Sequence, residues 1–189
     1  MKVVKVDNSL IGELQKSGIS KLMKSLESCE WLVIEEEENR IIGAAGMGGF
    51  FHVSSIQIIE EFQNKGIGKR LQSELIEESR RKGYSFIIVL FNPENIRSMN
   101  LHISLGYKKI FRIKYSEKYI NDVSMIVFKP AGVFLQRILK SFNTKTGMFF
   151  LACCLKILKP LFKKLIAYNE KDLPTPSIRW IMKNFERIN

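Results

Sequence analysis

Residues 56–71 read IQIIEEFQNKGIGKRL, with an apolar run, then two glycines separated by one residue, then a basic segment. The apolar run is typical of a β-strand, and the glycines at 66 and 68 indicate a turn that opens a helix. Glycine lets the backbone approach a ligand closely, and the first N–H groups of a helix point toward whatever lies ahead of them. Together with the helix dipole and the cations Lys65, Lys69 and Arg70, these features predict a turn that binds a pyrophosphate.

Strand and helix patterns on both sides of this segment predict a single sheet with helices around it. Apolar runs indicate strands over 3–6, 31–34, 41–47, 52–59, 84–91, 108–115 and 122–128. Helical spacing indicates helices over 9–26, 64–83 and 93–105. We expect Ser9 to cap the first helix, Gly18 to split it, and Glu35–Arg40 to form a charged hairpin turn. The predicted fold class is α+β, with a mixed, mainly antiparallel central sheet, flanking helices and an α-helical C-terminal extension.

The glycine motif does not match two common nucleotide-binding patterns. It is neither G-x-x-x-x-G-K-[ST] nor a complete G-x-G-x-x-G, and it follows the fourth predicted strand rather than the first. Instead, Gln63–Gly68 (QNKGIG) resembles the Gln/Arg-x-x-Gly-x-Gly/Ala signature of the GNAT superfamily of acetyl-CoA-dependent N-acetyltransferases. Residues 92–107, NPENIRSMNLHISLGY, resemble the family's Asn-x-x-Ala-x-x-Leu-Tyr-x-x-x-Gly-Phe helix. The resemblance covers about residues 1–129.

This resemblance implies where acetyl-CoA binds. Backbone groups of the fourth strand would bind the pantetheine arm, backbone amides across the glycine turn would bind the pyrophosphate, and an asparagine of the later helix would contact the cofactor. The acetyl carbonyl would lie where the strands over 52–59 and 84–91 separate. The implied cofactor-binding residues are Ile56, Gln57, Ile58, Gln63, Asn64, Lys65, Gly66, Ile67, Gly68, Lys69, Arg70 and Asn95. No metal site is implied.

His102 is the predicted catalytic residue. It stands where the family's helix usually has the tyrosine that protonates the departing thiolate. A tyrosine with a pKa of about 10 is a proton donor at any cellular pH, whereas a histidine with a pKa of about 6.5 is only about one quarter protonated at pH 7. His102 serves as the acid if its pKa is raised. Action as a neutral hydrogen-bond donor, action as a base through water, and packing alone also remain open.

The general base is not fixed by the sequence. Related acetyltransferases of protein amino termini often carry a glutamate on the fifth strand, where this chain has Leu90. Glu60, Glu61 and His52 remain as candidates for a base acting through water, alongside direct attack with no dedicated base.

Composition separates the last third of the chain from the rest. Residues 1–130 hold 19 basic and 16 acidic residues, whereas residues 131–189 hold 11 and 3. We therefore expect an acetyltransferase domain over 1–129 and a basic amphipathic helical extension over 130–189. In that extension Lys156, Lys159 and Lys163 share one helical face, and Pro160 would kink the helix or open a second one.

Three roles of the extension remain open. In the first, it folds over the amine-binding side or forms a homodimer. In the second, residues 133–167 contact an anionic membrane surface. In the third, the lysines of the extension bind RNA. RNA ranks last because we expect no interleaved exposed aromatic residues there. Three cysteines without a disulfide or metal pattern, and no signal-like or membrane-spanning stretch, predict a cytoplasmic protein.

Together these observations predict an N-acetyltransferase that moves an acetyl group from acetyl-CoA to a primary amine of a small molecule or peptide by direct attack. The acceptor stays unidentified. The alternative is a non-catalytic acyl-CoA-binding module that its basic tail docks to a membrane or a protein.

Overall fold

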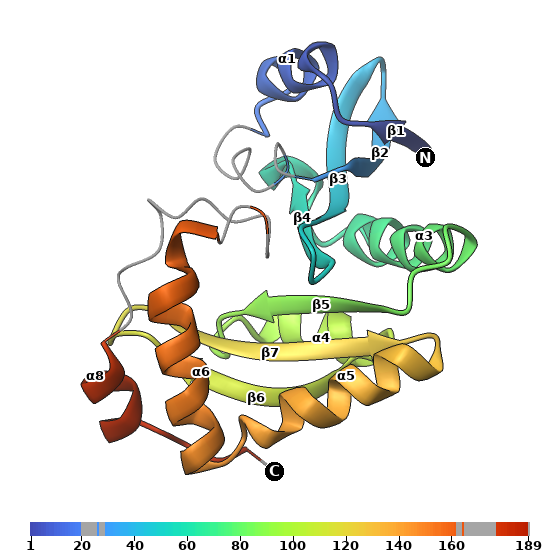
Figure 1. Cartoon of the computed structure of the whole chain (residues 1–189). Helices are drawn as coiled ribbons and strands as arrows, with labels where there is room; N and C mark the ends of the chain where they lie inside the picture. Colours follow the sequence, from blue (N-terminus) through green and yellow to red (C-terminus); the bar gives the residue numbers. More distant parts are fainter. Residues whose placement is uncertain (20–25, 27–28, 162–163, 165–176, 189) are drawn as a thin grey trace. The chain divides into compact units, whose positions relative to one another are not determined.

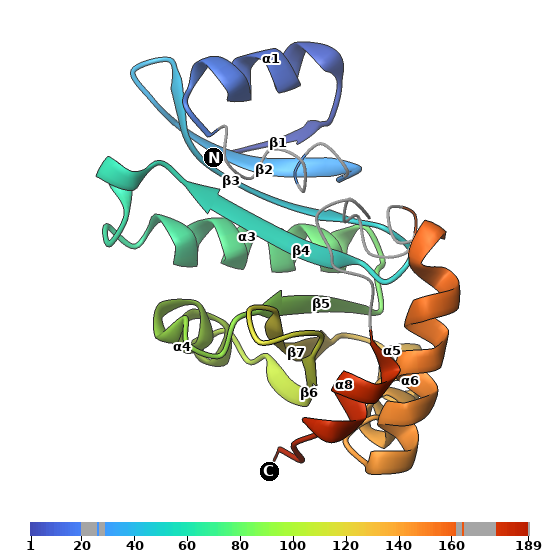
Figure 2. The same cartoon turned by 90° about the vertical axis from the view of Figure 1, so that its left-hand side faces the viewer.

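The computed structural model describes residues 1–19, 26, 29–161, 164 and 177–188 (Figures 1 and 2). The chain divides into two compact units. Residues up to Gly83 belong to the first unit, and the described residues from Tyr84 to Leu161 and from 177 to 188 belong to the second. Each unit has its own strands and helices.

The first unit is built on four antiparallel strands. They are β1 (Lys2–Lys5), β2 (Trp31–Glu37), β3 (Arg40–Gly48) and β4 (Val53–Ile58), paired in that order. Helix α3 (Ile67–Arg81) packs on β2, β3 and β4, and its Leu71 and Leu75 are fully buried. Helix α1 (Asn8–Lys16) buries Leu10 and Leu14 in a cluster with residues of β2 and β3, and the short 3-10 turn η2 (Glu60–Phe62) follows β4.

Local details of the first unit differ from the sequence expectation. Asp7, not Ser9, caps α1, because its carboxylate accepts a hydrogen bond from the Leu10 amide at 2.9 Å. The hairpin turn is shorter than predicted, since only Glu38 and Asn39 have left-handed backbone angles, with φ of 49° and 62°. Two such residues form the turn that matches the twist of a tight hairpin, so β2 continues to Glu37. The part of the predicted first helix over 20–25 lies outside the described residues.

The second unit has three antiparallel strands, with β7 (Ile120–Val127) between β5 (Phe86–Phe91) and β6 (Lys108–Lys114). Helix α4 (Ile96–Ser104) lies on one face of these strands, and α5 (Pro130–Ser141) and α6 (Lys145–Leu158) lie on the other (Figure 2). The described chain ends with η3 (Lys159–Leu161) and α8 (Ile178–Lys183).

A buried carboxylate connects β6 and β7. Asp122 has no exposed side-chain surface, and its two oxygens accept hydrogen bonds from Arg112 at 2.6 and 3.1 Å. Lys109 contacts the same carboxylate at 2.7 Å. Burial acts to raise the pKa of Asp122, but the bonds from Arg112 and Lys109 outweigh it and hold that pKa below its usual value. Lys109 and Arg112 are thus matched within the fold.

The described part of the extension packs against the second unit. Helix α5 contacts β6 and β7, and α8 contacts α6 and β6. At Gly132 a Cβ atom would meet the Ser85 carbonyl oxygen at 2.4 Å, so α5 approaches the backbone more closely than any other residue would allow. After α8, Glu186 pairs with Lys114 at 2.8 Å. The domain boundary at residue 129 stays a prediction, because the helices beyond it share a core with the strands before it.

Two expectations about the extension meet the structure differently. Helix α6 ends at Leu158 and Pro160 lies in η3, in line with a helix interrupted near this proline. The expectation of no exposed aromatic residues was wrong, because Phe134, Phe149 and Phe150 are all exposed. Helical periodicity cannot tell which face a neighbouring sheet will cover. Lys163, Leu165 and residues 174–176 lie outside the described residues.

Both units contain antiparallel strands flanked by helices, which confirms the expected α+β class and the helical C-terminal extension. Within the described ranges, no helix is both long and apolar enough to cross a bilayer. The same part of the chain holds no cluster of three or more histidine, cysteine or acidic side chains arranged to bind a metal ion.

Candidate functional site

The N-terminus of α3 is open to solvent. Gly66 precedes the helix with φ of 76°, a left-handed conformation that glycine adopts at little cost, and no side chain caps the helix. Asn64 also has a left-handed φ, of 64°. The Gln63 side chain stabilises the turn, because its amide donates a hydrogen bond to the Ile58 carbonyl at 3.3 Å. The helix therefore presents its first amides outward, as an anion site requires.

The three cations predicted at this turn have different surroundings. Arg70 forms an ion pair with Glu35 of β2 and also donates to the Lys65 carbonyl at 3.3 Å. The Lys65 ammonium lies 4.6 Å from the centre of the Phe62 ring. Lys69 is exposed and forms no ion pair with any described residue. The structure thus assigns Arg70 to holding the turn in place and leaves the ammonium of Lys69 available to an anion.

The strand before the turn supplies the other predicted cofactor residues. Ile56, Gln57 and Ile58 lie on β4 opposite Ala45, Ala44 and Gly43 of β3, and all three are half-buried. Their antiparallel pairing with β3 fixes the direction in which the chain enters η2 and the glycine turn. Strand, turn and α3 therefore form one continuous, internally braced segment from Ile56 to Arg70.

A shallow hollow of about 520 Å³ borders the turn along α3, lined by Met1, Gly66, Lys69, Arg70, Ser73, Glu74 and Glu77. Its two carboxylates are paired: Glu74 with Arg81 at 2.6 Å and Glu77 with Arg80 at 3.1 Å. These pairs neutralise negative charge that would otherwise repel a phosphate near Gly66.

In the second unit, Asn95 is the N-cap of α4. Its side-chain oxygen accepts a hydrogen bond from the Ser98 amide at 3.0 Å. The N-terminus of α4 is therefore closed by the protein's own side chain, and any contact between Asn95 and a cofactor has to use the remaining amide group.

His102 is buried on α4, with an exposed fraction of 4%. Its ring stacks on Phe91 with a centroid distance of 5.5 Å and meets Tyr107 edge-on at 5.1 Å. The Nδ1 atom lies 2.7 Å from the Ser98 carbonyl oxygen, which can only accept, so Nδ1 carries the proton. Burial lowers the pKa of His102, and the hydrogen bond with Ser98 opposes that shift only in part.

These two facts argue against the expected acid role of His102. A lowered pKa favours the neutral ring at physiological pH, and in the neutral ring only one nitrogen carries a proton. Because that proton is on Nδ1, Nε2 can accept a proton but cannot donate one to a thiolate. The sequence analysis left the required rise in pKa open, and the surroundings of His102 move the pKa the other way.

Two neighbours of His102 were missed by the sequence analysis. Ser98 precedes it by one helical turn, a spacing that signals contact on a helix. Tyr107 is buried, burial raises its pKa, and its hydroxyl has no hydrogen-bond partner among the described residues. From the sequence, a residue directly after a helix-ending glycine is expected to pack in the core. No local pattern predicts a buried hydroxyl without a hydrogen-bond partner at that position.

The candidates for a general base other than His102 all belong to the first unit. Glu61 is committed to an ion pair with Arg40 at 2.7 Å, and Glu60 is exposed on η2. His52 has a left-handed φ of 48°, and burial lowers its pKa against the opposing effect of Glu30. His52 is therefore the candidate whose neutral form is favoured near pH 7.

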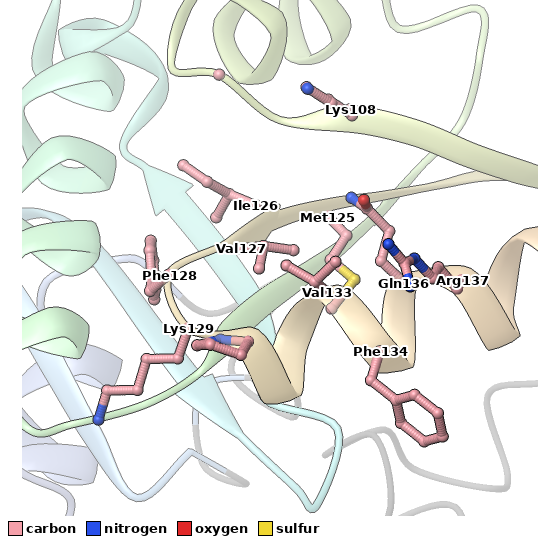
Figure 3. A pocket seen from close by; sticks show the side chains of 12 residues that line it. Lys108, Met125, Ile126, Val127, Phe128, Lys129, Val133, Phe134, Gln136 and Arg137 are labelled. Atoms are coloured by element: carbon pink, nitrogen blue, oxygen red, sulfur yellow. The ribbon is translucent and has the colours of Figure 1, made fainter.

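A larger hollow of about 700 Å³ lies in the second unit between β7 and α5. Figure 3 shows Met125, Val127 and Val133 turned toward one another, while Phe134 points away from them. The cations Lys108, Lys129 and Arg137 also line it. None of the predicted cofactor or catalytic residues contributes to this hollow.

Comparison with known proteins identifies the family. Residues 8–107 match the model of the acetyltransferase (GNAT) family, and that range includes the open turn, α3 and His102. The chain belongs to the GNAT family. Over 84 residues it is 32% identical to the L-amino acid N-acyltransferase MnaT of Escherichia coli and, equally, to the L-methionine sulfoximine/L-methionine sulfone acetyltransferase of Salmonella typhimurium. These matches cover 40% of the chain, which spans about half the length of the two curated relatives.

Solved GNAT structures share the fold. The Salmonella typhimurium protein yncA, solved with its cofactor acetyl-CoA, has a TM-score of 0.55 at 17% identity and covers 68% of this chain and 94% of its own. A GNAT superfamily phosphinothricin acetyltransferase from Sinorhizobium meliloti, in complex with acetyl-CoA, has a TM-score of 0.51 at 17% identity, covering 67% and 88%.

Proposed function

We propose that this GNAT protein transfers an acetyl group from acetyl-CoA to the amine of a small acceptor. The observation that carries the proposal is the uncapped, solvent-exposed N-terminus of α3 at Gly66, inside the segment that matches the family. A left-handed glycine, outward amides and the unpaired cation of Lys69 have the properties that a pyrophosphate needs. The residues present therefore fit the phosphate end of acetyl-CoA.

Acetyl-CoA supplies an activated acyl carbon, and the chain's residues bind and orient it. The turn from Gln63 to Lys69 would hold the pyrophosphate. Arg70 stabilises that turn through its ion pair with Glu35. The backbone of β4 from Ile56 to Ile58 supports the pantetheine arm. The neutral amine would attack the thioester carbonyl: the C–N bond forms, the C–S bond breaks, CoA leaves as a thiolate, and the proton that the amine loses passes through water to that thiolate or to a neutral imidazole.

An L-amino acid is the first acceptor class to test. Both curated relatives are named for acylation of amino acids or amino acid analogues. Their similarity covers 40% of this chain and about half of their own length.

The decisive experiment is free-thiol release from acetyl-CoA by the full chain against a panel of L-amino acids, polyamines, aminoglycosides and lysine peptides. Release with one amine class, and mass-spectrometric detection of the N-acetyl product, would support the proposal and name the acceptor. Tight acetyl-CoA binding in calorimetry without release by any amine would instead support the non-catalytic acyl-CoA-binding alternative.

The role of His102 is tested by its pH dependence. If the neutral imidazole accepts a proton, turnover should be constant near neutral pH and should fall as the pH drops through the pKa of His102, which lies below its ordinary value. In His102→Phe that acid-side fall should disappear together with part of the turnover. Activity that instead rises toward acid pH in the unmodified protein would restore the thiolate-protonating role.

A further inference from the structure

The described helices of the extension expose a set of large apolar side chains. On α5 they are Val133, Phe134 and Ile138, and on α6 and η3 they are Phe149, Phe150, Ile157 and Leu161. We call these residues the apolar face. Phe134 is 67% exposed, Phe150 60% and Ile157 75%. Phe134 and Ile138 are one helical turn apart, and Phe150, Ile157 and Leu161 repeat at helical spacing. Both helices lie on the same face of the second unit's strands (Figure 2).

Unpaired cations accompany this apolar face. Arg137, Lys140, Lys145 and Lys156 are exposed and form no ion pair with any described residue. The sequence contains no acidic residue between Asp122 and Glu170. The C-terminal half of α3 is different, because its Arg80 and Arg81 pair with Glu77 and Glu74 of the same helix. The extension thus combines exposed apolar side chains with positive charge that the fold itself does not use.

We infer that α5 and α6 dock this protein on the surface of an anionic lipid bilayer. Phenylalanine and aliphatic side chains gain free energy by entering the boundary between headgroups and acyl chains, while lysine and arginine bind lipid phosphates. The hollow between β7 and α5 places Lys108, Lys129 and Arg137 around an apolar floor, next to the outward Phe134 (Figure 3). That arrangement suits the headgroup and upper acyl chains of one anionic lipid.

Two other occupants fit the same surface less well. A symmetric dimer would place this face against its own copy and bring unpaired cations of the same sign together. Single-stranded RNA would use the phenylalanines for stacking, but Val133, Ile138, Ile157 and Leu161 have no ring on which a base can stack. Of these three occupants, only a bilayer surface uses both the aliphatic side chains and the positive charge.

The test is co-sedimentation of the full chain with phosphatidylcholine vesicles and with vesicles that also contain phosphatidylglycerol. We expect binding to the anionic vesicles, weaker binding at high salt, and little binding to phosphatidylcholine alone. The double substitution Phe134→Ser/Phe150→Ser should lower the vesicle affinity by on the order of 100-fold. The matched control Ile103→Ser removes a comparably exposed apolar side chain from α4, on the opposite face of the second unit's strands, and should leave binding unchanged.

A series of charge substitutions distinguishes the effect of the cations on α5 and α6 from the effect of the protein's net charge. Replacing Arg137, Lys140 and Lys145 by glutamine should reduce binding by roughly 100-fold, because each cation near an anionic surface contributes about fivefold. The control replaces the exposed Lys5, Lys16 and Lys118, which gives the same net charge and should have a much smaller effect. Soluble glycerol phosphate should not compete with the vesicles, since it offers no acyl chains.

Three results would overturn the inference. The first is no binding to anionic vesicles at low salt. The second is a dimer in light scattering that Phe134→Ser/Phe150→Ser dissociates, which would assign the apolar face to a second copy of the chain. The third is release of bound vesicles by an RNA oligonucleotide at a lower concentration than free lipid requires. That result would assign the apolar face to nucleic acid.

Discussion

The α3 turn and the β6–β7 pair are both rich in cations but use them in opposite ways. On β6, Lys109 and Arg112 converge on Asp122, whose side chain is fully buried, so their charge is balanced inside the fold. At the α3 turn, Arg70 is balanced by Glu35 while Lys69 and the open helix end face solvent. The comparison teaches that a basic residue marks a ligand site only when the fold leaves its charge unmatched.

Asp122→Asn should give the largest effect, because it leaves Arg112 and Lys109 without their buried partner. We expect a loss of about 3 kcal/mol in the free energy of unfolding, measured by urea denaturation. For a chain of this size that corresponds to a fall in Tm of roughly 6–12 °C. The control Glu61→Gln breaks the exposed pair with Arg40 and should cost under about 1 kcal/mol.

Acid unfolding tests the same carboxylate. The pKa of Asp122 is lowered in the fold, so its contribution is present above about pH 4 and is lost as the pH falls through the lowered value. The unmodified protein should lose stability more steeply than Asp122→Asn as the pH falls below 4. Parallel stability curves for the two proteins would mean that Asp122 carries no net stabilisation.

Gly66→Ala tests the open end of α3. A Cβ atom at this position meets nothing closer than the Arg70 guanidinium at 3.7 Å, so the cost is the left-handed φ of 76° and not a clash. We expect a loss of about 1–2 kcal/mol in stability and weaker acetyl-CoA binding in calorimetry. Gly12→Ala, in the middle of α1 with open space around it, should instead stabilise the protein by about 0.5–1 kcal/mol.

Lys69→Gln should give the smallest effect and the most selective one. Because Lys69 makes no ion pair with a described residue, its loss should leave Tm unchanged and weaken acetyl-CoA binding about three- to tenfold, with a shallower dependence on salt. Lys16→Gln on α1 is the control with the same charge change. Equal acetyl-CoA affinities for the two variants would remove Lys69 from the cofactor site.

Much of the fold could be predicted because its signals are local. The glycines at 66 and 68 mark the strand-to-helix turn in the sequence. The apolar run that forms β5 is bounded by residues that end strands. The α1 cap was misplaced because Asp7 and Ser9 are both good caps two residues apart, and only the backbone geometry distinguishes them.

Features that depend on distant partners were beyond sequence reasoning. The ion pair of Arg70 with Glu35 joins residues 35 positions apart, and it gives Arg70 a partner within the fold besides the predicted cofactor contact. The protonation of His102 depends on burial between Phe91 and Tyr107, which no helical pattern specifies. The exposed phenylalanines of the extension follow from which side of α5 faces β6 and β7.

The side chain of Asn143 joins two segments of the second unit that lie far apart in the sequence. Its amide nitrogen donates to the Ile188 carbonyl at 2.7 Å, and its oxygen accepts from the Ile188 amide at 2.9 Å, as a neighbouring peptide group would. This pair of bonds closes a loop between residues 45 positions apart. Asn143→Ala removes both bonds, so the residues after α8 are then held, within the described part of the chain, by the contacts of α8 with α6 and β6 and by the ion pairs of Glu186.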